Sequence, residues 1–225
     1  MWQGASELKR AAALGYGAAV DQAAAGPTEV FERLADLQEQ TGRVVVHPFE
    51  DPLVVAGQAT VGLEIGEDLP EVDVVVVPAG GGALVSGIAS ALPQARVVAV
   101  EPVGSRALHD ALAAGEPVRV IPDSVADGLN APFAGRLPLE LCQEHGVETV
   151  LVSEEEIAEG FRFLYQRAKL AAEPAGAAGV AAVLAGKVAG VEGSTVAVVV
   201  SGGNVVGETA SGILKSNPPE AEYED

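Results

Sequence analysis

Three consecutive glycines, Gly80, Gly81 and Gly82, lie between the apolar run VDVVVVP and a segment with helical character. Because glycine has no Cβ, several main-chain N–H groups can turn toward one anion at such a loop. The helix expected from Ala83 adds the partial positive charge of its N-terminus. The sequence therefore predicts a phosphate-binding loop, with a tight strand-to-helix turn that binds no ligand as the alternative.

A second loop consists of Ser201, Gly202, Gly203 and Asn204 and follows the apolar run TVAVVV. Ligands of open α/β sheets bind at the carboxyl ends of the strands, so we expect the two glycine loops to face one crevice. Ser201 offers a neutral hydroxyl that can donate or accept a hydrogen bond. An ordinary turn is the alternative here as well.

Two carboxylates stand at the ends of predicted elements, Glu101 at the end of a strand and Glu173 at the start of a helix. Glu101 follows the apolar run RVVAV, and Glu173 stands at the start of an Ala-rich helix, where stabilisation of the helix dipole is the alternative role. The GxSxG nucleophile elbow is absent, and the loop at Gly80 has neither the Walker ending nor the GxGxxG spacing. Cys142, the single cysteine, excludes an internal disulfide and a multi-cysteine zinc site, and the three scattered histidines do not suggest a metal centre.

Alternating helices and strands must position these loops. We expect helices at 5–14, 26–42, 54–69, 83–92, from 105, at 136–145, 153–170 and 173–188. We expect strands at 17–20, 43–47, 72–78, 96–101, 147–152 and 195–203, the last one buried. Ser153 and Glu156 form a predicted capping box, Ser6 is a candidate N-cap, and the polar tail 217–225 is expected to fray. This order predicts an α/β fold, a mostly parallel open sheet with helices on both faces.

Composition restricts the partners. The 13 Lys+Arg residues against 32 Asp+Glu give a net charge of −19, which repels nucleic acid and anionic membranes. A chain that is 48% hydrophobic can bury a core, and no apolar run reaches the ~18 residues of a membrane span. No signal peptide opens the chain, so we expect a cytoplasmic protein without nucleic-acid or membrane partners.

Seven short motifs occur in an order and spacing that resemble the threonine dehydratase and serine racemase family of fold type II pyridoxal-phosphate (PLP) enzymes. The motifs are HPFEDP from His47, AGQAT from Ala56, VVVPAGGGALVSGIA around Gly80, VEP around Glu101, ADG around Asp127, EPAGA from Glu173 and SGGN from Ser201. The resemblance covers nearly the whole chain and implies the tryptophan synthase β-like PLP fold.

The resemblance also implies roles. Its cofactor-binding positions fall on Gly80, Gly81, Gly82, Ala83, Glu173, Ser201 and Gly202. The glycines would hold the PLP phosphate through N–H groups, Ser201 would bond the pyridine nitrogen, and Glu173 would lie near the ring. The implied reaction eliminates the β-hydroxyl of threonine or serine and yields a 2-oxo acid and ammonia.

Several positions depart from the family pattern. Ala83 stands in place of a fourth loop glycine, and Ala59 in place of the glycine of GQGT. Glu101 matches one ligand of a divalent cation site, but Ala107 occupies the position of its aspartate partner. The Schiff-base lysine motif Ser-Phe-Lys-x-Arg-Gly and the Ser-x-Gly-Asn-His motif do not occur, and no lysine, Lys169 included, has a matching context. The resemblance therefore supplies no catalytic residue, and whether this chain alone is an enzyme stays open.

We interpret residues 1–47 as the remnant of a small domain and 48–225 as the large PLP-binding domain of an N-terminally truncated chain. The first hypothesis is a threonine/serine ammonia-lyase that acts on a small amino acid only when an N-terminal fragment complements it, with a homo-oligomer as the other expected assembly. The second is a catalytically dead module that binds PLP or an amino acid. The third is an unrelated α/β protein with phosphate-binding loops.

Overall fold

The computed structural model describes residues 1–26 and 29–216. The chain divides into two compact units, Met1–His47 and Pro48–Asp225. None of the described helices is long and apolar enough to cross a membrane. Each unit is described below by itself.

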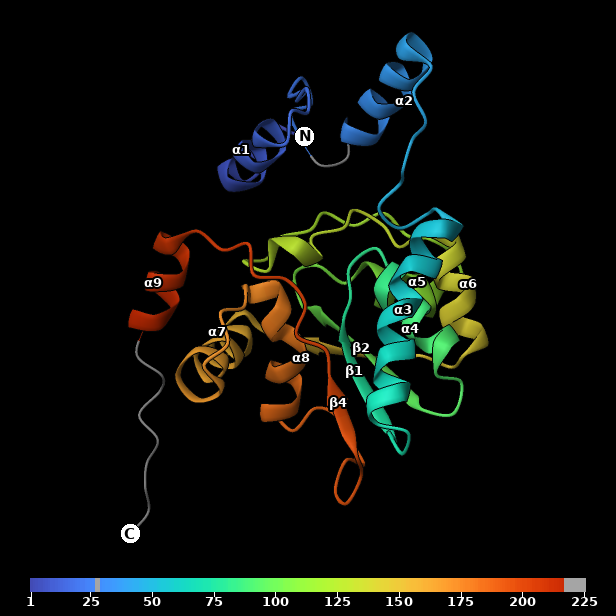
Figure 1. The fold of residues 1–225 in the computed structure, drawn as a ribbon, viewed down its shortest axis with the longest axis vertical. Helices are drawn as coiled ribbons and strands as arrows, with labels where there is room; N and C mark the ends of the chain where they lie inside the picture. The colour runs from blue at the N-terminus through green and yellow to red at the C-terminus, as the bar shows by residue number, and fades with distance from the viewer. Residues whose placement is uncertain (27–28, 217–225) are drawn as a thin grey trace. The chain divides into compact units, whose positions relative to one another are not determined.

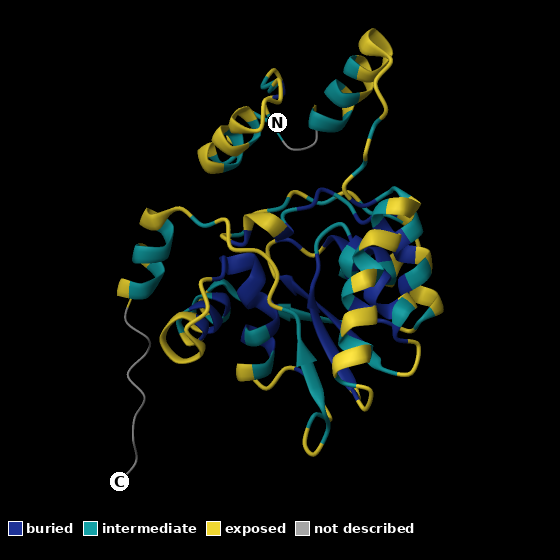
Figure 2. Cartoon of the chain, viewed as in Figure 1, coloured by how far each residue is buried: buried dark blue, intermediate teal, exposed yellow. Residues whose placement is uncertain are grey.

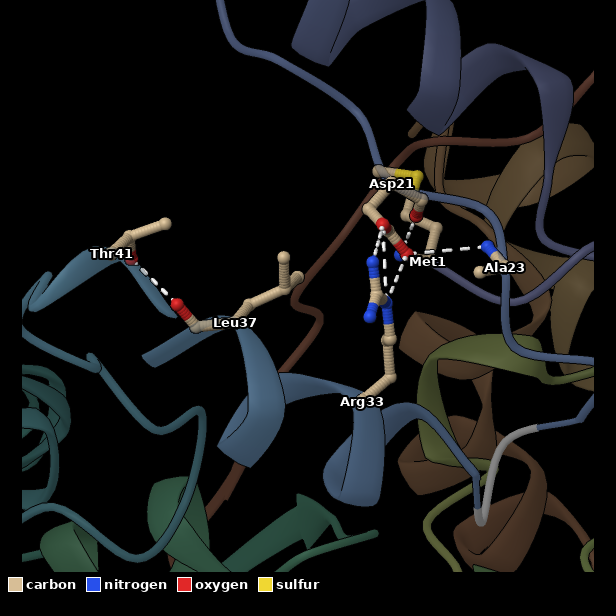
Figure 3. Close-up of polar contacts among 6 residues, drawn as sticks. All are labelled: Met1, Asp21, Ala23, Arg33, Leu37 and Thr41. Atoms are coloured by element: carbon tan, nitrogen blue, oxygen red, sulfur yellow. Dashed lines mark hydrogen bonds and ion pairs between the residues drawn. The ribbon is translucent and has the colours of Figure 1, made fainter. Parts of the chain in front are cut away.

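The first unit contains two helices, α1 (Glu7–Gly15) and α2 (Glu29–Thr41) (Figure 1). Asp21 links α2 to the N-terminus of the chain. The Asp21 carboxylate pairs with Arg33 at 2.8 Å, and the Asp21 carbonyl accepts a 2.7 Å hydrogen bond from the N-terminal ammonium of Met1 (Figure 3). Ser6 occupies the N-cap position of α1, as predicted, but its side chain makes no capping hydrogen bond.

The two strands predicted in this unit, at 17–20 and 43–47, are wrong. Within the described residues of the unit, the only β pairing is a single bridge between Trp2 and Ala24. Val44 and Val46 are 89% and 72% exposed. An apolar extended segment becomes a strand only when a neighbouring segment takes up its N–H and C=O groups, and sequence pattern alone does not supply that neighbour.

The second unit is built on a parallel sheet in the order β3-β2-β1-β4 (Figure 1). Its strands are β1 (Val74–Pro78), β2 (Arg96–Pro102), β3 (Glu148–Val152) and β4 (Val196–Val198). The central pair aligns Val77 with Ala99. The predicted α/β class, a mostly parallel sheet with helices on both faces, is confirmed.

Alternate side chains of β1 face two different helical layers. Val75 and Val77 pack into one apolar cluster, and Val74 and Val76 pack into another. Helices α3 (Pro52–Asp68), α4 (Ala83–Ala91), α5 (Ala107–Ala114) and α6 (Arg136–Glu144) contribute to the first cluster. Helices α7 (Glu154–Phe163) and α8 (Pro174–Leu184), with the 3-10 turn Asp127–Leu129, contribute to the second. The VVVVP run is therefore buried on both faces, as its uninterrupted apolar character predicts.

The last strand is shorter and less buried than predicted. The structure assigns only Val196–Val198 to β4, and these residues are half-buried, as the teal arrow in Figure 2 shows. β4 is an edge strand that pairs with β1 alone, and the Val199 N–H just beyond it still donates to the carbonyl of Val76 at 2.9 Å before the chain reaches the Ser201 loop. Helix α9 (Gly207–Lys215) was not predicted, and it packs Ile213 and Leu214 against Phe161. The tail 217–225 lies outside the described residues.

Close packing of α3 on α4 fixes the helix that follows the first glycine loop. A methyl group at Gly87 of α4 would lie 2.7 Å from the backbone nitrogen of Ala59 and 2.7 Å from the carbonyl oxygen of Val55. The two backbones therefore approach more closely than a side chain between them allows. Helix α4 is therefore held against α3 at Gly87.

The predicted capping box at the start of α7 is confirmed. The Glu156 N–H donates to the Ser153 hydroxyl at 3.2 Å, and the Ser153 N–H donates to the Glu156 carboxylate at 2.7 Å. We expect Ser153→Ala to lower the free energy of unfolding by about 1 kcal/mol, because one N-terminal donor of the helix loses its acceptor. Urea denaturation measures this loss. Ser153→Asn, which keeps a capping oxygen, should stay close to the parent, and equal losses for both variants would refute the capping role.

Candidate functional site

The two glycine loops line one cavity of about 310 Å3 at the carboxyl ends of β1 and β4. This arrangement agrees with the crevice that was expected because both loops follow the carboxyl ends of strands. Every position at which the resemblance implies cofactor binding lies in its wall: Gly80, Gly81, Gly82, Ala83, Glu173, Ser201 and Gly202.

The first loop turns from β1 into α4 with no room for side chains. Gly82, the N-cap of α4, has a φ of 97°, a left-handed conformation that favours glycine. A methyl group at Gly82 would lie 2.8 Å from Cβ of Pro138, and one at Gly80 would lie 3.0 Å from the carbonyl oxygen of Leu129. Among the described residues, no partner accepts a hydrogen bond from the N–H groups of Gly80, Gly81 or Gly82. This loop has the geometry of an anion cradle.

The second loop joins the cavity through Glu173. The Glu173 N–H donates to the carbonyl of Gly202 at 3.1 Å, and a methyl group at Gly202 would lie 2.3 Å from Oε1 of Glu173. Gly202 has a φ of 89°, so both conformation and contact require glycine. Glu173 is only 9% exposed, whereas Ser201 is exposed at the cavity wall. A carboxylate and a hydroxyl thus line the same cavity as the first glycine loop.

Further lining residues had no role assigned from sequence. Phe49, Gln58 and Gly128 lie in the cavity wall, and each belongs to one of the seven motifs. The ring of Phe49 covers Gly81, since a methyl group there would lie 2.2 Å from the ring, and it packs edge-on against Phe133 with centroids 5.2 Å apart. The motifs themselves were the signal that could have identified these residues.

Glu101 does not line this cavity. Its fully buried carboxylate accepts hydrogen bonds from the N–H groups of Leu108 at 2.9 Å and His109 at 2.7 Å, in the first turn of α5. Burial raises the pKa of Glu101 to about 8, and the two backbone donors oppose that shift. The described residues contain no cluster of three or more His, Cys, Asp or Glu side chains that could hold a metal ion. Glu101 thus caps α5 in the structure, and its role in a cation site stays a prediction.

Cys142 is fully buried in α6, and burial raises the pKa of its thiol to about 12. A thiol of this kind stays protonated at neutral pH and is a poor nucleophile. Cys142 is therefore a packing residue of the core.

The lysines of the second unit lie away from the cavity wall that the described residues form. Lys169 ends the π-turn Leu164–Ala168 with a φ of 61°, and its ammonium donates to the carbonyl of Gln166 at 2.6 Å. The ammonium of Lys187 pairs with Glu156 at 2.7 Å. The described wall of the cavity therefore presents no amine.

Three comparisons relate this chain to known proteins. The family model "Pyridoxal-phosphate dependent enzyme" matches residues 1–202. The L-threonine ammonia-lyase of Thermotoga maritima is 47% identical over 182 residues, which are 79% of this chain and 45% of that protein. The L-threonine ammonia-lyase of Geobacter sulfurreducens is 39% identical over 205 residues, which are 89% of this chain and 51% of that protein. The chain thus spans about half the length of these two curated relatives.

The solved structure of maize serine racemase superimposes with a TM-score of 0.86 at 32% sequence identity. The match covers 94% of this chain and 67% of the racemase chain. The fold of this chain therefore has a counterpart of known structure.

Proposed function

The chain belongs to the pyridoxal-phosphate dependent enzyme family, and we propose that its second unit holds PLP for ammonia-lyase chemistry on a small hydroxy amino acid. One observation carries this proposal: both glycine loops, Glu173 and Ser201 line a single cavity. The two L-threonine ammonia-lyases support threonine as a substrate, and the similarity to maize serine racemase supports serine.

The residues of the cavity fit the cofactor. A phosphate needs several donors at one point, and the side-chain-free loop at Gly80, Gly81 and Gly82 offers N–H groups together with the N-terminus of α4. Ala83 keeps the first helical position small, with 7% of its surface exposed. Ser201 offers a neutral hydroxyl to a ring nitrogen, and Glu173 offers a carboxylate beside it.

When bound, PLP supplies an electron sink for the charge that develops at the α-carbon of an amino acid. The residues of this chain bind and orient. The backbone donors of the loop hold the phosphate, and the Ser201 hydroxyl holds the ring nitrogen without the full charge of a carboxylate. The ring of Phe49 packs against Gly81 and limits the space on that side of the loop.

The lysine needed for covalent attachment and proton transfer would come from a segment or chain that complements this one. A PLP-binding module without turnover is the second candidate, and the absence of a lysine among the described residues that line the cavity favours it for this chain alone. The proposal includes assembly of the chain, either as a homo-oligomer or with a complementing fragment. Light scattering measures the molar mass of that assembly.

Equilibration of the protein with PLP, followed by separation of free from bound cofactor, tests the proposal. We expect one PLP for each chain, displaced by inorganic phosphate. Borohydride treatment and mass spectrometry then report whether a lysine is labelled, and an assay for 2-oxo acid with threonine or serine reports turnover. Bound PLP without labelling or turnover supports the module for this chain alone, labelling with turnover contradicts an outside source of the lysine, and failure to bind PLP overturns both candidates.

A further inference from the structure

Glu50 supplies a helix cap from a distant part of the sequence. Its carboxylate accepts hydrogen bonds from the N–H groups of Arg136 at 2.7 Å and Leu137 at 3.2 Å, the first two residues of α6. These N–H groups have no acceptor within their own helix, and a carboxylate complements the helix dipole at this end. The two donors lie 86 and 87 residues from Glu50 in the sequence.

Glu50 takes the place that a capping side chain would fill. The N-cap residue of α6 is Gly135, which has no side chain of its own. A methyl group at Gly135 would lie 2.7 Å from Oε2 of Glu50 and 3.0 Å from the carbonyl oxygen of Phe49. The segment Phe49-Glu50 is therefore seated directly on Gly135.

Gly135 in turn holds the first glycine loop. Its N–H donates to the carbonyl oxygen of Gly81 at 3.0 Å. In a planar trans peptide the C=O and the following N–H point in opposite directions. The hydrogen bond to Gly81 therefore sets the direction of the Gly82 N–H, which points away from Gly135.

We propose that Glu50 is a positioning residue for the phosphate loop. By capping α6 it fixes Gly135, and Gly135 fixes the peptide plane that aims the Gly82 N–H at the anion. This inference rests on the proposed function of the loop, and Glu50 itself is assigned no contact with the ligand.

Binding of PLP and of inorganic phosphate to the full chain tests this role with matched variants. We expect Glu50→Ala to raise the Kd for both ligands about tenfold or more. Glu50→Gln should lie between the parent and Glu50→Ala, since its amide oxygen still accepts one of the two N–H groups. Asp51→Ala is the matched control, because Asp51 caps α3 through the Leu53 N–H at 2.8 Å, from the same segment, and leaves Gly135 untouched.

Asp51→Ala should destabilise the fold to a similar degree as Glu50→Ala but keep the parental Kd. Equal weakening of binding by Glu50→Ala and Asp51→Ala, or a parental Kd for folded Glu50→Ala, overturns the proposal. Amide hydrogen exchange gives a readout that needs no ligand: Glu50→Ala should speed exchange of the Gly135 N–H, and Asp51→Ala should not. If the parent binds neither ligand, the proposed function fails, and the exchange measurement still decides whether Glu50 holds Gly135.

Discussion

Replacement of Gly82 by alanine is expected to weaken the binding of PLP and of inorganic phosphate more than a hundredfold. Gly82 has a φ of 97°, which costs an L-residue about 1–2 kcal/mol, and the new methyl group would lie 2.8 Å from Cβ of Pro138. The loop must shift to relieve both the strained backbone conformation and the close contact with Pro138. Two charge-assisted hydrogen bonds lost from a phosphate amount to about 3–6 kcal/mol, which exceeds a hundredfold change in Kd.

Gly115→Ala is the matched control for this experiment. Gly115 follows α5 with a φ of 77°, and a methyl group at this position would have no atom within 4 Å beyond its chain neighbours. This variant should carry the same kind of backbone strain and bind the ligands as the parent does. Isothermal titration of both variants under conditions in which they are folded makes the comparison. If Gly82→Ala bound PLP and inorganic phosphate with the parental Kd, the assignment of this loop as the anion-binding site would be refuted.

The second large effect concerns the pH dependence of stability through Glu101. Burial raises the pKa of this carboxyl from 4.5 to about 8, Asp110 adds to the shift, and the N–H groups of Leu108 and His109 oppose it. Between these two pH values the folded chain binds a proton that the unfolded chain has released. The contribution of Glu101 to the free energy of unfolding is therefore greatest below about pH 4.5 and falls as the pH rises to about 8.

We expect this loss to be on the order of a few kcal/mol, since one pKa unit corresponds to about 1.4 kcal/mol. Urea denaturation at a series of pH values from 5 to 9 measures it. Glu101→Gln cannot ionise, so its stability should change less over this range, although loss of one acceptor lowers it at pH 5. Cys142, which also feels the charge of Glu101, has a pKa of about 12 and does not titrate in this window. Parallel pH profiles for parent and variant would contradict the assignment.

Local patterns predicted the second unit well. The apolar run at 72–78 became β1, the helix expected at 54–69 became Pro52–Asp68, and the capping box at Ser153 is present. These elements rest on short-range rules, such as burial of an uninterrupted apolar run or a cap within four residues. The order and spacing of the seven motifs identified the family. Each of the two glycine loops follows its own strand, as predicted.

The same rules failed where an element needs a distant partner. The segment 43–47 has the apolar, β-branched residues of a strand, yet it forms no strand within the described part of the first unit. The final strand is shorter than predicted, Val196–Val198, and β1 is its one neighbour in the sheet. Strand pairing is a contact between segments, and residue pattern specifies only one of the two sides.

By itself, the sequence determined the α/β class, the family and the positions of the loops suited to PLP, since these follow from residue type and spacing along the chain. Only the tertiary structure decided what the carboxylates do. Glu101 caps α5 and Glu50 caps α6, whereas Glu173 enters the wall of the cavity. A carboxylate accepts hydrogen bonds from whichever donors the fold brings near, and for Glu50 those donors lie 86 and 87 residues away.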